Sequence, residues 1–437
     1  MKPRPAHAGP RAAADEAVVA TLGNGVRVVV FRLPQLATAA VSVFVRSGSH
    51  HEGARQNGIS HFIEHMAFKG TRTRDCQQVN LDAERLGAEV NAHTDKDHTA
   101  FHMRGLARDA LAFLRMLGDV VRHGTFPEAE LERERQVILN EFAEDEDDAM
   151  ATAFKLFDRA CYGEHPVACP VIGSRANLRR FTRTELVDWV QRQYTGANTV
   201  VGVAGDVDPG QVAAAAHEVF GDMLRGADNV IAAPDYVGGI RSRRLPGCSQ
   251  VHAVLGFPIP ALPDEHHAFV VAAALFGEGM SSPLLDRLRE RRGLVYHADC
   301  SADVRDRYGQ FVIEASTLPG HLDEYFEEVT RLLREHVDGT DPVGLERARN
   351  QIAVRGLCAR EDPGQRLELA ALDLFAMGRV RSRDELLANI GDVGPARVRE
   401  AFARMLGAGA AVALAGRIAK DDEERVARRV ALRPTAA

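Results

Sequence analysis

The feature that most constrains the fold is a repeat within the 437-residue chain. The segment LERERQVILNE, residues 131–141, is matched 214 residues later by LERARNQIAVR, residues 345–355. A second segment, VGVAGDVD around Gly205, is matched by VALAGRIA around Gly416 at the nearly equal offset of 211. Two matches at nearly one offset indicate an internal duplication. We therefore expect two halves of similar architecture.

Each half combines strand-like and helical segments. NGVRVVVFRLP and TAAVSVFVRSGS are β-branched runs bounded by turn residues, which is typical of strands. Residues 88–105 alternate around a polar centre like a hairpin, and residues 296–316 are their counterpart in the second half. The sequence predicts an α+β fold of two homologous domains, each a mainly antiparallel sheet packed with helices. The turn-rich stretch 227–243 predicts a linker between an N-terminal domain, 1–226, and a C-terminal domain, 244–437.

The pentapeptide HFIEH, residues 61–65, has the spacing of a metal site. On a helix, His61 and His65 share one face, and two imidazoles there can bind one zinc ion. Glu64 points to the same region and can act as a general base on a metal-bound water. The alternative is a surface helix with incidental histidines. The apolar flanks of the pentapeptide favour partly buried histidines, which need partners.

Catalytic zinc sites usually have three protein ligands, so a third is expected elsewhere. Glu134 and Glu141 are seven residues apart and share one face of a predicted helix. One could bind the metal while the other braces a ligand histidine, and the spacing does not choose between them. The second copy has Ala348 and Arg355 at these positions and no HxxEH motif, so the predicted metal site belongs to the N-terminal domain alone.

GISHFIEHMAFKGT followed by ELERERQVILNE resembles the pitrilysin family of inverted zinc metallopeptidases. The likeness is greatest to the β-subunit of mitochondrial processing peptidase and its bacterial relatives, and it continues through GAEVNAHT, HPVACPVIGS and GEGMSSPLLDRLRERRGLVYH. The resemblance implies one Zn²⁺ per chain, with His61, His65 and Glu141 as ligands. It also implies Glu134 as the residue that braces a ligand, and Glu64 as the general base.

The resemblance implies substrate contacts as well. Arg289 and Tyr296, seven residues apart in LRERRGLVY, correspond to a pair that reaches the substrate from the second half. Without the resemblance they would be interpreted as a surface arginine and an aromatic residue at a strand start. Asn91 and Ala92 correspond to an edge strand that pairs with the peptide main chain. The alternative is that Asn91 satisfies local backbone groups.

Three further histidines, His93, His98 and His102, lie on the hairpin of residues 88–105. We predict that they are not metal ligands, because three better ligands are already assigned.

The predicted function is a zinc-dependent metalloendopeptidase that cleaves unfolded peptides or presequence-like segments inside a dimeric chamber. A homodimer is favoured, because the zinc motif and the Arg–Tyr pair occur in one chain. The alternative is a non-catalytic scaffold subunit derived from such a peptidase, but those typically have a degraded zinc motif. The net charge of -7 argues against nucleic acid as the main partner and favours basic or neutral substrates. The acidic run of residues 144–148 predicts a solvated loop or, alternatively, a negative wall of the chamber.

The same sequence predicts a cytoplasmic protein of bacterial type. Its six cysteines are scattered without a C-x-x-C pair, which is typical of reduced thiols. The N-terminus has no apolar segment of a secretory signal before Asp15, and no apolar run approaches the ~20 residues that span a bilayer.

Overall fold

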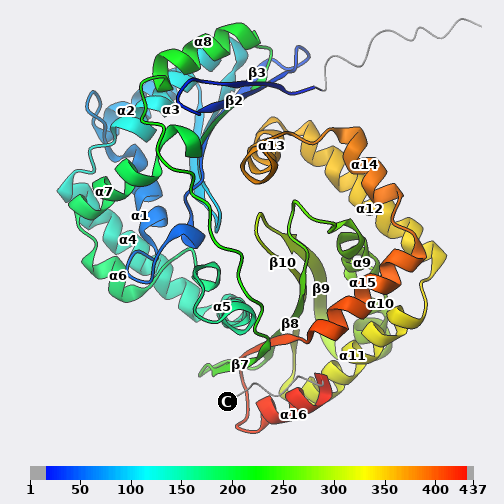
Figure 1. Cartoon of the computed structure of the whole chain (residues 1–437). Helices are drawn as coiled ribbons and strands as arrows, with labels where there is room; N and C mark the ends of the chain where they lie inside the picture. Colours follow the sequence, from blue (N-terminus) through cyan, green and yellow to red (C-terminus); the bar gives the residue numbers. More distant parts are fainter. Residues whose placement is uncertain (1–15, 431–437) are drawn as a thin grey trace, which may run out of the picture.

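The computed structural model describes residues 16–430, which form two sheets, each carrying its own set of helices (Figure 1). The strands of the first sheet are β1 (Val18–Thr21), β2 (Arg27–Arg32), β3 (Thr38–Val45), β4 (Glu89–Thr94), β5 (Thr99–Leu106) and β6 (Thr199–Gly205). Those of the second are β7 (Gly239–Arg244), β8 (Val251–Ile259), β9 (Val295–Val304), β10 (Gly309–Thr317) and β11 (Ala411–Gly416).

Apart from β1, which has no counterpart in the second sheet, the two sheets have the same topology. The first has the order β1-β2-β6-β3-β5-β4, and the second has the order β7-β11-β8-β10-β9. Only one pair in each is parallel, β2 with β6 and β7 with β11, and the other neighbours are antiparallel. The predicted α+β class, the mainly antiparallel sheets and the duplication are thus confirmed.

The helices repeat in the same order. Those before the second sheet are α1 (Ile59–Met66), α2 (Cys76–Arg85), α3 (Ala110–His123), α4 (Glu128–Asp147), α5 (Ala149–Tyr162), α6 (Arg175–Arg180), α7 (Arg183–Gln193) and α8 (Pro209–Phe220). Those of the second half are α9 (His267–Gly277), α10 (Pro283–Leu285), α11 (Leu322–Asp338), α12 (Pro342–Glu361), α13 (Pro363–Met377), α14 (Arg383–Gly391), α15 (Pro395–Ala408) and α16 (Asp422–Val430). The matched helices α4 and α12 are each 20 residues long and begin 214 residues apart.

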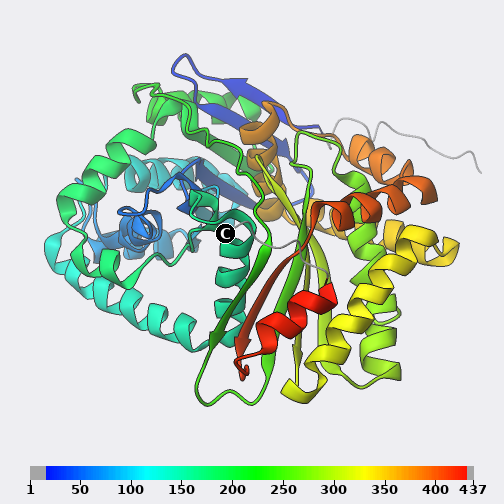
Figure 2. The ribbon, with the colours of Figure 1, turned by 60° about the horizontal axis from the view of Figure 1, so that its bottom comes forward.

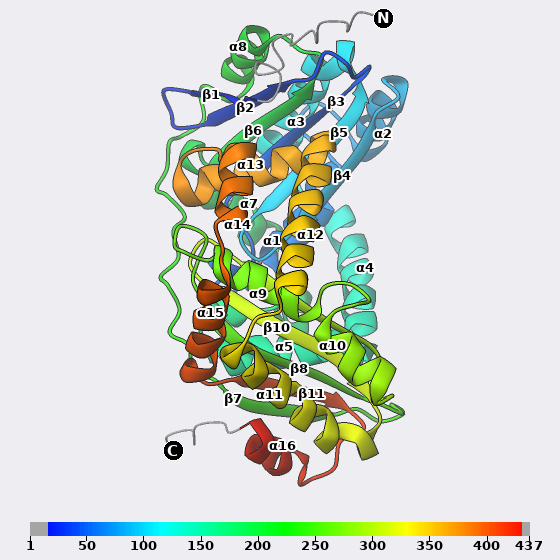
Figure 3. The ribbon, with the colours of Figure 1, turned by 90° about the vertical axis from the view of Figure 1, so that its right-hand side faces the viewer.

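Strand β2 illustrates why each sheet is covered on both faces. Successive side chains of a strand point to opposite faces, and in β2 both sets are apolar. Val28 and Val30 pack with the helices of the first half, whereas Val29 and Phe31 pack on the opposite face against α13. A helix of the second half therefore covers the inner face of the first sheet, and Figure 3 shows α13 in front of that sheet.

The exchange between the halves is reciprocal. Helix α5, from the first half, covers the inner face of the second sheet, where Phe157 packs among residues of β8, β10 and β11. In Figure 2, α5 (teal) stands beside the strands of this sheet. Glycines admit both helices: a Cβ at Gly202 would lie 2.9 Å from Leu367 of α13, and one at Gly256 would lie 2.5 Å from the Phe157 ring. Each half thus completes the core of the other.

The connection between the halves is extended. Residues 224–238 contain no helix or strand, and β7 begins at Gly239 and pairs with β11 in the second sheet. Residues 239–243 of the predicted linker are therefore part of the second sheet. They form a strand at the edge of the sheet, and their polar sequence, GIRSR, carries little of the alternation that marks a strand.

Residues 144–147 of the acidic run are helical, whereas a loop was expected. Helix α4 continues to Asp147, and the side chain of Asp148 accepts hydrogen bonds from the backbone N–H groups of Met150 and Ala151 at the start of α5. Ion pairs such as Asp145 with Lys155 hold the carboxylates in place. No helix within residues 16–430 has the length and apolar character needed to cross a bilayer.

The exchanged packing of α13 can be tested by truncating one side chain. Leu367 is fully buried between α13 and the first sheet, so we expect Leu367→Ala to lower the free energy of unfolding by about 2–5 kcal/mol. Leu369 lies on the same helix but is 39% exposed, so Leu369→Ala is the matched control, with an effect within about 0.5 kcal/mol. Urea denaturation of both variants provides the measurement. Equal effects would contradict the role of α13 as part of the core of the first half.

Candidate metal centre

Helix α1, which carries the HxxEH motif, is held at its start by a buried carboxylate. The first N–H groups of a helix have no partner within it. Here Glu52 accepts hydrogen bonds from the N–H groups of Gly58 (2.7 Å) and Ser60 (2.8 Å) and from the side chain of Asn57 (3.1 Å). Gly58 has φ +99, and a Cβ there would lie 2.9 Å from the backbone of Gly173. These contacts fix where α1 begins and hence the direction of its side chains.

The two faces of α1 have different partners. Ile59, Phe62, Ile63 and Met66 are buried in the core of the first half. Ser60 is buried as well, whereas His61, Glu64 and His65 are half-buried and face neighbouring helices and strands. The expected partial burial of both histidines is therefore observed.

Helix α4 supplies the two glutamates from one face, as their spacing predicts. It is anchored by Arg135, whose guanidinium is buried and donates hydrogen bonds to the carbonyls of Leu178 and Phe181. Glu134 and Glu141 both reach α1 but contact different atoms of it. Spacing alone left their roles open, and the atomic contacts distinguish them.

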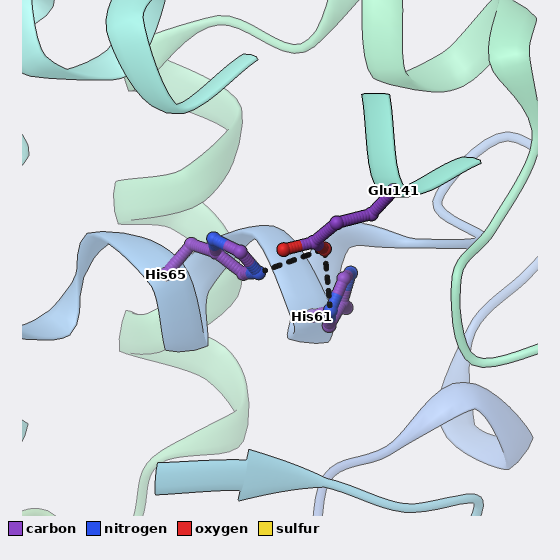
Figure 4. Close-up of side chains that lie close together, drawn as sticks. All are labelled: His61, His65 and Glu141. Carbon is purple, nitrogen blue, oxygen red and sulfur yellow. Dashed lines mark ion pairs between the residues drawn. The ribbon is translucent and has the colours of Figure 1, made fainter. Parts of the chain in front are cut away.

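Figure 4 shows the imidazoles of His61 and His65 directed at the carboxylate of Glu141. Glu141 Oε2 lies 3.3 Å from His65 Nε2 and 3.8 Å from His61 Nε2. Glu134 lies behind His65: its Oε2 is 3.2 Å from His65 Nδ1, and its Oε1 is 2.6 Å from Lys69 Nζ. A proton on His65 Nδ1 donated to Glu134 leaves the Nε2 lone pair facing Glu141.

The donor atoms of His61, His65 and Glu141 fit a zinc ion. They all lie within 4.8 Å of one another, and two imidazoles with one carboxylate form a known zinc ligand set. Burial, with a smaller effect of nearby His65, lowers the pKa of His61 to about 3, so the ring is in the neutral form that binds metals. His61 is otherwise poorly satisfied, because Nδ1 is buried without a hydrogen-bond partner and Nε2 is too far from Glu141 for a hydrogen bond.

Glu64 lies beside this cluster and has a different environment. Burial raises its pKa, while His65 and a hydrogen bond from Thr94 Oγ1 to Glu64 Oε2 (3.2 Å) favour the charged form. Thr94 is at the end of β4, the strand at the open edge of the first sheet. The edge strand and the glutamate of the HxxEH motif are thus joined by one hydrogen bond.

Asn91 and Ala92 lie on β4, which pairs with β5 along one edge and is the last strand of the first sheet. The Asn91 side chain accepts a hydrogen bond from the N–H of Ala92 (2.8 Å), so it does satisfy a local backbone group, as the alternative interpretation expected. The strand edge beyond these residues has no partner strand in the described chain.

Arg289 and Tyr296 are close to each other in the second half. The guanidinium lies 5.4 Å from the centre of the Tyr296 ring, which is a cation–π arrangement, and Tyr296 is 83% exposed. The other described contacts of Arg289 are with Met280 and Glu290. The structure brings this pair together but gives it no contact with the His61–His65–Glu141 cluster.

Two family models match the chain. The model described as insulinase, peptidase family M16, matches residues 27–175, and the model described as peptidase M16 inactive domain matches residues 180–352. A protein of Mycobacterium leprae, named as an uncharacterized zinc protease, is 33% identical over 387 residues, which are 85% of this chain and 85% of that protein. The chain belongs to peptidase family M16. The resemblance to pitrilysin-type peptidases is confirmed.

Other proteins are similar to this one over nearly the whole chain. A Bacillus subtilis protein, also named as an uncharacterized zinc protease, is 28% identical over 86% of this chain and 93% of its own length. The crystal structure of a protease from Helicobacter pylori has a TM-score of 0.83 at 20% identity and covers 92% of this chain and 100% of that one. A Pseudomonas fluorescens structure described as a peptidase M16 inactive domain has the same TM-score and identity. Both structures confirm the M16 fold.

Three residues that contact α1 or a glutamate of the candidate site were not found from the sequence. Thr94 was visible only as the residue after a hairpin histidine, and Lys69 only as a residue near a helix end. Glu52 lies nine residues before His61 in a turn-rich segment, and nothing in SHHEGARQNG signals that its carboxylate is buried. Each acts through a contact that only the folded chain creates.

The start of α1 can be tested at Gly58. Gly58→Ala forces a left-handed residue, which costs about 1–2 kcal/mol, and also drives a Cβ against the Gly173 backbone. We expect a larger loss of stability than for Gly87→Ala, because Gly87 also has a positive φ (+62) but has open space around its Cβ position. The midpoint of thermal unfolding of both variants is the measurement. A Gly58→Ala midpoint equal to that of Gly87→Ala would contradict the close packing at this site.

Proposed function

We propose that this chain is a zinc-dependent endopeptidase that cleaves unfolded peptides. The observation that carries the proposal is the convergence of His61 Nε2 and His65 Nε2 on one carboxylate oxygen of Glu141, with Glu64 beside them. Family membership and the names of its relatives support the same reaction class. The proposed ligands of the single zinc ion are His61, His65 and Glu141.

When bound, zinc supplies Lewis-acid polarisation of a water molecule and of the scissile carbonyl. The residues of the chain perform the proton transfers. Glu64 accepts the proton of the attacking water and later returns it to the leaving amine. Thr94 holds the Glu64 carboxylate in position, and Glu134 with Lys69 orients the ring of His65.

The substrate is proposed to bind along β4. Its open edge offers main-chain hydrogen bonds at Asn91 and Ala92, and such pairing accepts many sequences because it ignores side chains. Strand addition requires an extended segment, which favours unfolded peptides. Arg289 and Tyr296 of the second half are proposed to contact the peptide or the developing oxyanion, as a guanidinium and a phenol can donate hydrogen bonds to it.

The net charge of -7 favours basic peptides, including presequence-like segments. We propose a homodimer that encloses the substrate, since one chain carries both the zinc motif and the Arg–Tyr pair.

A non-catalytic scaffold is the second candidate, because residues 180–352 match a model described as an inactive domain. These residues belong mainly to the copy in which Ala348 and Arg355 replace the two glutamates. Among the described residues, no group of three metal-ligating side chains consists of second-half residues alone. The word inactive in the description of this family model therefore fits the second half, which lacks the proposed metal ligands. The first half keeps all of the proposed catalytic groups.

The role of Glu64 is tested by Glu64→Gln, which keeps the size of the side chain but cannot accept a proton. We expect hydrolysis of an unstructured peptide to fall by about 10²–10⁴-fold while the zinc content of the protein is unchanged. Peptide hydrolysis and metal analysis are measured on the same preparation, with and without a chelator. Near-normal hydrolysis in the variant would refute the mechanism, and the scaffold function predicts no hydrolysis in either protein.

The bracing role of Glu134 is tested by Glu134→Gln, which weakens the contacts with both His65 and Lys69. Loss of such a contact behind a ligand typically lowers metal affinity about 10–100-fold. Glu128→Gln removes the same charge from an exposed position on the same helix and is expected to leave the affinity unchanged. Competition with a chromogenic zinc chelator gives both affinities, and equal values would exclude this role.

A further inference from the structure

A second cluster of metal-ligating side chains lies where the two halves meet. It consists of His93 at the end of β4, His98 just before β5, and Glu368 of α13. Figure 3 shows α13 near the hairpin of β4 and β5. The two histidines come from the first half and the glutamate from the second, 275 residues after His93.

The three donor atoms form a nearly equilateral triangle. His93 Nε2 lies 3.3 Å from His98 Nε2 and 3.3 Å from Glu368 Oε1, and His98 Nε2 lies 3.4 Å from the same carboxylate oxygen. Four ligands placed tetrahedrally at ~2.0–2.1 Å from a zinc ion are separated by about 3.3–3.4 Å. The triangle therefore has the size of one face of a zinc coordination tetrahedron.

Both imidazoles are oriented through their second ring nitrogen. His98 Nδ1 is 2.7 Å from Asp97 Oδ1, and His93 Nδ1 is 3.1 Å from His102 Nε2. His102 Nδ1 in turn lies 2.8 Å from Ser42 Oγ on β3. Metal-binding histidines characteristically have such a partner, commonly a carboxylate, on the nitrogen that does not bind the metal. By this criterion the cluster is better organised than the first site, where His61 Nδ1 has no partner.

The cluster is also accessible on one side. The His98 side chain is 1% exposed, whereas those of His93 and Glu368 are 40% and 33% exposed. A cation can therefore enter from solvent, and a water molecule can complete its coordination. Two histidines and one glutamate with an open fourth position form a ligand set that zinc accepts.

The geometry points to a second binding site for a zinc-type divalent cation at His93, His98 and Glu368, which links the first sheet to α13 of the second half. This assignment reverses the prediction that His93 and His98 are not ligands, and it keeps His102 as a residue that orients His93. The cation would bind the folded arrangement of the two halves and not the unfolded chain, so it would stabilise their contact. The site is separate from the proposed catalytic zinc and does not depend on peptidase activity.

Zinc stoichiometry of the full-length protein tests this inference. Metal-free protein is equilibrated with Zn²⁺, freed of unbound metal and analysed for zinc per chain. We expect two equivalents for the wild type and one for His61→Ala/His65→Ala, in which only the new site remains. We expect one for Glu368→Gln and none when all three substitutions are combined. Glu361→Gln, at an exposed position at the end of α12, is the matched control and should bind two.

Two further measurements distinguish the loss of a ligand from misfolding of a variant. His93→Gln alters a half-exposed side chain, so this variant should fold and bind one equivalent of zinc. Its circular dichroism spectrum should match that of the wild type. In His61→Ala/His65→Ala, Zn²⁺ should raise the midpoint of thermal unfolding, and Co²⁺ should give the visible absorption of a tetrahedral site. Adding Glu368→Gln should abolish both effects. One equivalent in the wild type with none in His61→Ala/His65→Ala would overturn the inference, as would two equivalents in Glu368→Gln.

Discussion

The burial of both faces of both sheets is the constraint on which the rest of the structure depends. Every residue of β6 and of β11 is buried, so neither central strand has a face that could meet solvent. The helices of each half cover only one face of its sheet. The other face must be covered from elsewhere, and the reciprocal placement of α5 and α13 provides this cover. Neither half has a complete core without the other, and their relative position follows from this exchange.

Comparison of the two copies distinguishes features that both share from residues that only the first has. Both copies keep the sheet order, the 20-residue helix and the exchanged helix. The helix α1 that follows β3 differs from its counterpart α9 that follows β8, because α1 is apolar on one face whereas α9 has mainly buried residues along its whole length. At the position of Glu134 the second copy has Ala348, which is fully buried. Ala348 thus serves packing, whereas Arg355, at the position of Glu141, is exposed and pairs with Glu278.

The sequence was sufficient where the signal is periodic or repeated. The offset between α4 and α12, the hairpins and the buried strands could be predicted, because hydrophobic pattern and turn residues are local. It was insufficient for β7, which is polar, and for the end of α4. There a run of carboxylates suggested a loop, although α4 continues to Asp147, Asp145 pairs with Lys155 and Asp148 caps the start of α5. Local pattern does not contain these contacts.

The candidate site divides in the same way. The spacing of His61, Glu64 and His65 requires only one helix, so it could be recognised from five residues. Which of Glu134 and Glu141 faces the Nε2 atoms depends on how α4 lies against α1, and spacing left this open. Glu368 could not be found, because it reaches His93 only through the exchange of α13 between the halves. The longer the separation in the chain, the more a contact depends on the complete fold.

Strand β4 contacts both α13 of the second half and α1, which carries the HxxEH motif. Its last two residues point to opposite faces of the sheet, and each contacts a residue of one of the two proposed sites. His93 contacts Glu368 on α13, and Thr94 donates its hydrogen bond to Glu64 on α1. One edge strand therefore contacts α13 of the second half through His93 and the proposed base through Thr94, and the same strand is proposed to pair with the peptide.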